Sequence, residues 1–167
     1  YLACVDLEPT FAPGEEGGPT IYLGSLGKIN CFFFCAGKEA HAGEYYEGFS
    51  PAPVLSRINL ALDGNPAFAD SFQGRIFPPF GCQRQTDLRG DYSATIMTRG
   101  FAFYSYLTST RQPGEILSEL KAVAREALEA SIGQYRKNAG EFIARGGFLS
   151  GIREWEPAVL TFAELNR

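Results

Sequence analysis

The sequence is poor in the side chains that build most metal and catalytic sites, because its 167 residues include only one histidine, His41. A catalytic zinc needs about three protein ligands and an open position. His41 lies in a glycine-bracketed run, residues 37–44, that looks like one piece of an active site. Since one histidine cannot complete such a site, the chain is either not an enzyme or one part of an enzyme.

Cysteine is scarce as well, with four residues at positions 4, 31, 35 and 82. They are too few and too irregularly spaced for a disulfide framework or a paired zinc knuckle. Three phenylalanines separate Cys31 from Cys35, which is typical of a strand and not of a redox turn. We therefore expect a reduced, cytoplasmic protein.

The sequence has neither a long apolar run nor a concentrated run of basic residues. No stretch approaches ~18 consecutive apolar residues and no charged leader precedes an apolar run, so we expect neither a membrane span nor a signal peptide. The 15 Lys and Arg residues are scattered along the chain, and 19 Asp and Glu residues outnumber them to give a net charge of -4. Because nucleic-acid phosphates require a basic patch, the sequence argues against a nucleic-acid partner.

The length and composition indicate one globular domain. A chain of 167 residues can bury one substantial core, and an apolar share of 45% is ordinary for such a domain. The sequence begins without methionine, on the apolar run Tyr1–Val5, as if partway along a strand. Together with the incomplete site, this start predicts a single domain, residues 1–167, excised from a larger protein.

Apolar periodicity and turn residues predict the order of the elements. Ile29–Ala36 is apolar on both faces except for Asn30, which is typical of a strand in mid-sheet or at an interface. Ser50 and Pro51 favour a helix start, and Gly64 a helix end. The sequence predicts strands over 1–5, 21–38, 82–86, 93–108 and 157–162, and helices over 50–64 and from 113 to about 145.

The two longest elements carry the clearest patterns. The strand over 93–108 is predicted to place one group on each face, Phe101, Phe103 and Leu107 against Tyr104 and Tyr106. The longest helix has one apolar stripe, made of Ile116, Leu117, Leu120, Val123, Ala124, Ala127, Leu128 and Ile132. Thr161 and Glu164 form a capping box that begins a further helix. The order predicts an α+β, ferredoxin-like split β-α-β fold, an antiparallel sheet with two helices on one face.

Two short segments carry a family resemblance: residues 6–10, Asp-Leu-Glu-Pro-Thr, and residues 37–43, Gly-Lys-Glu-Ala-His-Ala-Gly. Their pairing resembles the dinuclear-zinc metallopeptidase family of aminoacylases, acetylornithine deacetylase, succinyl-diaminopimelate desuccinylase and glutamate carboxypeptidase. With residues 22–29 and 82–89, the chain looks most like the RocB-type members, which serve arginine utilization. The similarity extends over nearly the whole chain.

The resemblance implies a parent with a zinc-bearing catalytic α/β domain and an inserted ferredoxin-like lid that dimerises through its sheet. This chain would be the lid, with residues 1–19 and 157–167 as the connections. Glu8 then matches the acidic zinc ligand just before the lid, and His41 matches the lid histidine that stabilises the oxyanion in the other subunit. Arg111 would meet the substrate carboxylate.

The sequence departs from the family pattern at two places. Gly48–Pro51 stands where lids often have a helix-leading Gly-x-Asn-Ala segment, and Thr98 stands near an expected asparagine. These departures bear on the identity of the substrate.

Each candidate residue also has a plainer interpretation. His41 would be a structural or surface histidine, Glu8 a solvated carboxylate at a strand end, and Arg111 a charge flanking a helix. Asp6 is a second candidate for the acidic ligand.

The function expected from the sequence is that of the lid and dimerisation domain of a zinc-dependent amide hydrolase. The parent would act on peptides or acyl-amino acids, and the isolated chain would be inactive, bind no zinc tightly and form a homodimer through its sheet edge. Two alternatives stay open: a free-standing ferredoxin-like module that binds a small effector, and a purely structural dimerisation domain.

Overall fold

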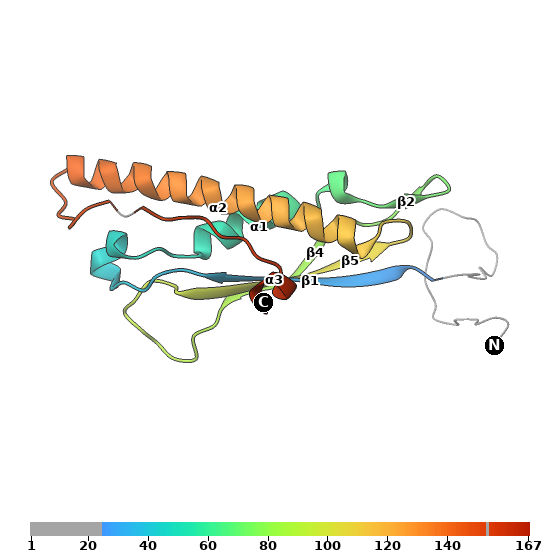
Figure 1. The fold of residues 1–167 in the computed structure, drawn as a ribbon, viewed down its shortest axis with the longest axis horizontal. Helices are drawn as coiled ribbons and strands as arrows, with labels where there is room; N and C mark the ends of the chain where they lie inside the picture. The colour runs from blue at the N-terminus through green and yellow to red at the C-terminus, as the bar shows by residue number, and fades with distance from the viewer. Residues whose placement is uncertain (1–24, 153) are drawn as a thin grey trace, which may run out of the picture.

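The computed structural model describes residues 25–152 and 154–167, which form an antiparallel sheet with helices (Figure 1). The predicted α+β class with an antiparallel sheet is confirmed. The elements are β1 (Gly27–Ala36), the 3-10 helix η1 (Ala42–Glu47), α1 (Ala52–Leu62), the 3-10 helix η2 (Pro66–Phe68), β2 (Ser71–Phe72), β3 (Arg75–Ile76), β4 (Gly81–Asp87), β5 (Arg99–Thr108), α2 (Pro113–Ala144) and α3 (Phe162–Leu165). The strand predicted over 1–5 lies outside the described residues.

The main sheet has the strand order β1-β5-β4, and both pairs are antiparallel. β1 pairs with β5 along its whole length, from Gly27 opposite Thr108 to Ala36 opposite Arg99. Within the described part of the chain β1 therefore lies at an edge, and the expectation that it lies in mid-sheet is wrong. The alternative explanation of its two apolar faces, an interface, stays open.

Both long helices form where the sequence predicts them. The Ser50 hydroxyl accepts the N–H of Ala52 at 3.3 Å at the start of α1, and Gly64, with φ 66°, follows its end. Gln112 and Glu115 form a capping box at the start of α2. Gly146 takes φ 89° just beyond its C-terminus, a conformation that a side chain would disfavour.

The core lies between one face of the sheet and the two helices, which cover the same side (Figure 1). Tyr104 and Tyr106 of β5 are fully buried there, as the alternation along that strand predicts. The Tyr104 hydroxyl donates to the side-chain oxygen of Asn59 at 3.1 Å, and the Tyr106 hydroxyl donates to the Phe68 carbonyl at 2.9 Å. Leu117, expected in the apolar stripe of α2, is instead 49% exposed, because it lies at the margin of the stripe.

Two predicted strand segments are wrong. Residues 93–98 do not belong to β5, since they pair irregularly with the loop that follows β1. Residues 157–161 form no strand, although Val159 and Leu160 lie against β1 and α2. The capping box predicted at Thr161 and Glu164 is confirmed, and it begins the four-residue α3.

The hairpin of β2 and β3 was not predicted. Its turn uses Gln73 and Gly74, both with positive φ. Within the described ranges, no helix is both long enough and apolar enough to span a bilayer.

Candidate functional site

The loop after β1 carries His41 and pairs with the segment before β5. Gly37 donates its N–H to the Thr98 carbonyl at 2.7 Å. His41 forms an isolated antiparallel bridge with Thr95. These contacts continue the β1–β5 pairing beyond the regular strands and hold His41 at one end of the sheet.

The His41 ring is oriented by its own loop. It caps the N-terminus of η1, and its Nδ1 accepts the N–H of Gly43 at 3.1 Å. Because Nδ1 is an acceptor in this bond, the proton of the neutral ring lies on Nε2. His41 is exposed, so the Nε2–H group is available to a molecule outside the loop.

Close backbone packing supports the same loop. Lys38 and Phe49 exchange N–H to carbonyl bonds at 2.9 and 3.0 Å, and the Lys38 ammonium donates to the Glu47 carbonyl at 2.9 Å. A Cβ atom on Gly37 would overlap the Phe49 carbonyl oxygen. The lack of a side chain at Gly37 therefore lets two segments of the chain itself approach closely. A Cβ on Gly48 would lie 2.6 Å from the Lys38 carbonyl oxygen.

The far end of α2 holds η1 in place. The Tyr135 hydroxyl donates to the Tyr46 carbonyl at 2.5 Å, and the rings of Tyr46 and Phe142 lie 5.2 Å apart between centroids. Glu47 accepts from the N–H and the hydroxyl of Ser150 at 3.1 and 2.7 Å. The position of His41 thus depends on tertiary contacts as well as on its own loop.

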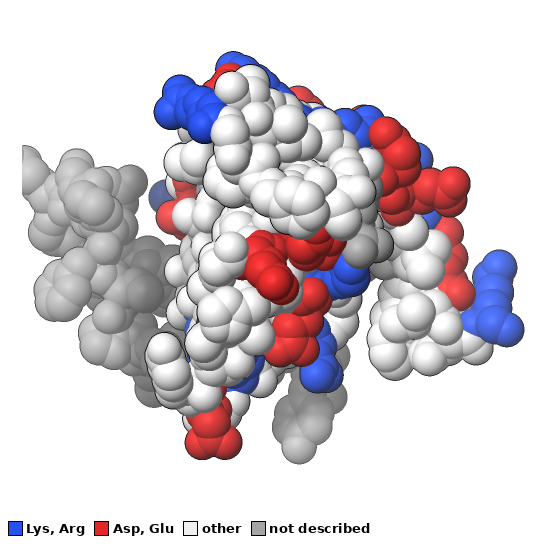
Figure 2. Space-filling model, turned by 90° about the vertical axis from the view of Figure 1, so that its left-hand side faces the viewer, with Lys and Arg blue, Asp and Glu red and all other residues white. Residues whose placement is uncertain are grey.

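A pocket of about 230 Å³ lies against η1. Its lining includes Tyr45, Tyr46, Phe142 and Phe148. Figure 2 shows this end of the molecule, where Asp and Glu side chains gather near the centre of the face. Glu44 and Glu47 also line the pocket, so the local charge favours a ligand with a cationic group over an anionic one.

Arg111 lies at the opposite end of the sheet from His41. Its guanidinium forms an ion pair with Glu119 at 2.5 Å and donates to the Tyr106 hydroxyl at 3.2 Å. The hydrogen bond to Glu119 raises the pKa of Arg111 above its usual range, against the lowering effect of burial. Within one chain, the structure does not bring Arg111 and His41 together, and the guanidinium is already engaged by its neighbours.

The proposed metal ligand Glu8 and its alternative Asp6 lie outside the described residues. Among residues 25–152 and 154–167, no three His, Cys, Asp or Glu side chains converge in a way that could hold a metal ion. The described residues therefore do not by themselves fit a zinc site.

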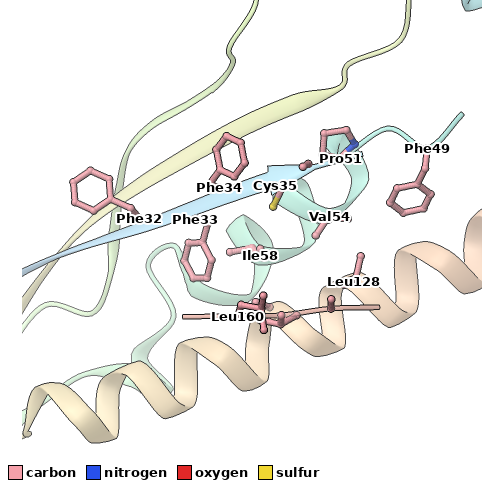
Figure 3. A pocket seen from close by; sticks show the side chains of 14 residues that line it. Phe32, Phe33, Phe34, Cys35, Phe49, Pro51, Val54, Ile58, Leu128 and Leu160 are labelled. Carbon is pink, nitrogen blue, oxygen red and sulfur yellow. The ribbon is translucent and has the colours of Figure 1, made fainter. Parts of the chain in front are cut away.

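A second concave region lies between β1 and the helices. A pocket of about 170 Å³ is bounded by Phe33, Ile58, Leu128 and Leu160 (Figure 3). Figure 3 shows Phe33 turned toward the helices, whereas Phe32 and Phe34 point away from them. A larger groove, of about 420 Å³, runs between β1 and the first half of α2 and is bordered by residues 159–162.

Several residues that position His41 were not anticipated from the sequence. Tyr135 is 89 positions from Tyr46, and no local pattern signals a contact over that separation. Thr95 was assigned to the interior of a strand, not to the loop contact that it makes.

Comparisons with known proteins match nearly the whole chain. It is 32% identical over 165 residues to the uncharacterized protein YqjN of Bacillus subtilis (strain 168). The alignment covers 98% of this chain and 30% of YqjN. It is 24% identical over 157 residues to Protein RocB of the same bacterium, which covers 93% of this chain and 28% of RocB.

The chain spans less than a third of the length of these curated relatives. No family model matches the sequence, and no solved structure matches it. The similarity to RocB along 93% of the chain points to a RocB-related family.

Proposed function

We propose that this chain is the lid and dimerisation domain of a RocB-like, zinc-dependent amide hydrolase. Three findings support the proposal: the similarity to RocB, the small share of RocB that the chain covers, and the α+β fold. The substrate would be a peptide or an acyl-amino acid. The finer description, a ferredoxin-like split β-α-β lid, is part of the proposal, since the main sheet has three strands among the described residues and not four.

The observation that carries the proposal is the exposed ring of His41, in which the accepting Nδ1 leaves the N–H on Nε2. The bond from Gly43 to Nδ1 fixes the ring, and an exposed donor at the end of a sheet can meet a substrate held by another subunit. A preoriented donor lowers the barrier when negative charge develops on the amide oxygen. In this role His41 donates a hydrogen bond from Nε2 and does not transfer a proton.

Zinc in this proposal would be held by the rest of the longer protein together with Glu8. When bound, the metal would supply an activated water for attack on the amide carbon. The described residues would orient the substrate. The negative charge near η1 suggests that substrates with a cationic side chain are preferred.

The test is the replacement of His41 in the full-length protein, assayed on neutral, acidic and basic acyl-amino acids and dipeptides. His41→Ala should lower kcat by about 10²–10³ and leave KM and metal content nearly unchanged, because the lost bond belongs to the transition state. His41→Gln should recover part of this loss, since its amide can donate from a similar position.

Tyr92→Ala is the matched control, because Tyr92 is 95% exposed on the loop between β4 and β5. It should leave kcat unchanged. Full activity of His41→Ala on the best substrate would remove His41 from the mechanism.

The alternative function is a regulatory module that binds a small effector. The groove of about 420 Å³ between β1 and α2 favours it, because apolar side chains such as Ile29, Phe33 and Leu120 line it. An effector that raises the melting temperature of the isolated chain, with the effect lost in Leu120→Trp, would support this reading over the lid.

A further inference from the structure

The face of the main sheet turned away from the helices carries four phenylalanines. On β1, Phe32 and Phe34 are 63% and 61% exposed, whereas Phe33 between them packs toward the core. On β5, Phe103 lies directly opposite Phe32, and Phe101 lies opposite Phe34. Residues directly opposite each other in a sheet share a face, so the four side chains form one block, called here the open aromatic face.

The rings of this face form a platform. Phe32 and Phe103 stack with centroids 4.7 Å apart and planes inclined by 15°, and Phe32 lies 5.7 Å from Phe101. Soluble proteins rarely leave large aromatic patches exposed unless the patch binds a partner. The face therefore marks a binding surface, and its charges indicate the kind of partner.

Three cations border the open aromatic face. The irregularity in β4 between Cys82 and Arg84 places Arg84 opposite Phe103. Lys28 lies opposite Leu107, and Arg99 lies opposite Ala36, at the two ends of the β1–β5 ladder. Among the described residues, none of the three makes an ion pair or a side-chain hydrogen bond, and no Asp or Glu of β1 or β5 shares the face.

We propose that the open aromatic face binds single-stranded nucleic acid, with bases stacked on the phenylalanines and phosphates near Lys28, Arg84 and Arg99. An antiparallel sheet with exposed aromatic rings on adjacent strands is a known platform for splayed bases. Two residues along a strand advance by about 6.7 Å, so Phe32 and Phe34 can each receive one of two successive bases.

The unpaired cations decide between this partner and an apolar protein surface. Such a surface would have to desolvate three charges that have no partner, which is costly. A phosphate backbone neutralises the same charges while leaving them near water. The three cations are far apart in the sequence, at positions 28, 84 and 99, and the absence of a basic run therefore did not reveal them.

The test is fluorescence anisotropy of labelled oligonucleotides mixed with the chain. The probes are a 12-nucleotide oligouridylate, the oligothymidylate of the same length and a 12-base-pair duplex. Both single strands should bind more tightly than the duplex. Three phosphate contacts predict that the logarithm of the association constant falls linearly with the logarithm of the salt concentration. The expected slope is about -2.

Substitutions assign the binding to the face. Phe32→Ala and Phe34→Ala should each weaken single-strand binding about tenfold or more, because each removes one stacking surface. Arg84→Ala should make the salt slope shallower by about 0.7. Phe148→Ala and Lys137→Ala are matched controls, since both side chains are well exposed and off the face, and they should leave affinity unchanged. Far-UV circular dichroism and melting temperature check that each variant is folded.

Several outcomes would overturn the proposal. One is the absence of single-strand binding at about 50 mM salt and 100 µM protein, conditions in which even non-specific contacts are detectable. Others are equal binding of duplex and single strand, or full affinity in folded Phe32→Ala. A dimer that Phe32→Ala dissociates would show instead that a second copy covers the face.

Discussion

At the scale of single residues, Asp70 joins parts of the chain that are distant in sequence. Its buried carboxylate accepts the N–H groups of Ser109 and Thr110 at 2.7 and 2.9 Å, and the hydroxyls of Thr108 and Thr110 at 2.9 and 2.7 Å. Burial raises the pKa of Asp70, but these hydrogen bonds outweigh that effect and hold the pKa well below its usual range. Asp70 thus fixes the turn that connects β5 to α2.

Asp70→Asn should lower the free energy of unfolding at pH 7 by about 2–3 kcal/mol, because a carboxamide nitrogen would then face N–H and hydroxyl donors. The wild-type carboxylate stabilises the fold above the pKa of an unfolded aspartate, and this contribution is lost as pH falls below about 4. The variant should therefore lose less stability on acidification than the wild type. Urea titrations at several pH values measure both effects, with Asp91→Asn on an exposed loop as the control.

Gly48 lies where the loop carrying His41 is most closely packed. An added Cβ would lie 2.8 Å from the Ala40 Cβ and 2.9 Å from the Ile96 Cδ1. Gly48→Ala should therefore lower the free energy of unfolding by about 1–3 kcal/mol and shift the NMR signals of His41.

The control for this substitution is Gly90→Ala, because a Cβ at Gly90 meets nothing within 4 Å. Its stability should stay within about 0.5 kcal/mol of the wild type. Equal stability of Gly48→Ala and Gly90→Ala would show that the atoms around Gly48 can move to admit a methyl group.

At the scale of elements, the sequence predicts those whose signals are local. α1 and α2 follow from apolar periodicity with Pro and Gly at their ends, and the two faces of β5 follow from strict alternation. The strand expected over 157–162 failed because its residues are apolar enough to cover the groove beside β1 without pairing. Apolar character shows that a segment is buried, but it does not show whether the backbone pairs.

The sequence likewise predicts only the part of the candidate site whose signals are local. The glycine-bracketed run places His41 in a loop after the first long strand, and the structure has it there. The full set of Arg111 partners could not be predicted, because Tyr106 and Glu119 are near it in sequence but Phe68 meets it only through the fold.

The segment that ends in α3 is held by a few polar contacts. Lys121 pairs with Glu164 at 2.7 Å, and Thr161 completes the capping box with Glu164. Thr161→Ala should release the segment, so that protease cleavage near residues 154–161 becomes faster while the melting temperature of the core changes little. Timed proteolysis with mass spectrometry measures this. Thr110→Ala removes a hydrogen bond to Asp70 instead. It should lower the melting temperature and have little effect on the rate of cleavage near residues 154–161.

At the scale of the whole molecule, β1 and β4 each have a strand neighbour on one side only among the described residues. Unpaired strand edges are templates for pairing with another chain. We expect the chain to form a homodimer through one of these edges as its concentration rises.

Sedimentation velocity should then show a monomer to dimer shift, and hydrogen exchange should show new protection in the amides of β1 or β4. The amides of β5 are the internal control, because β5 is already paired on both sides. Phe32→Ala should leave this dimer intact. A monomer at every concentration, with unchanged exchange at both edges, would contradict the edge dimer.

The length of α2 has a mechanical consequence. Its 32 residues span about 48 Å, whereas the 10 residues of β5 span about 33 Å, so the helix extends past the sheet (Figure 1). The ion pair between Arg111 and Glu119 lies near one end of this lever, and the contact with Tyr46 beside the His41 loop lies toward the other. A tilt of only about 5° at the first turn would move the far end by ~4 Å. Small changes at the Arg111 end are therefore amplified into displacements on the scale of a hydrogen bond at the opposite tip.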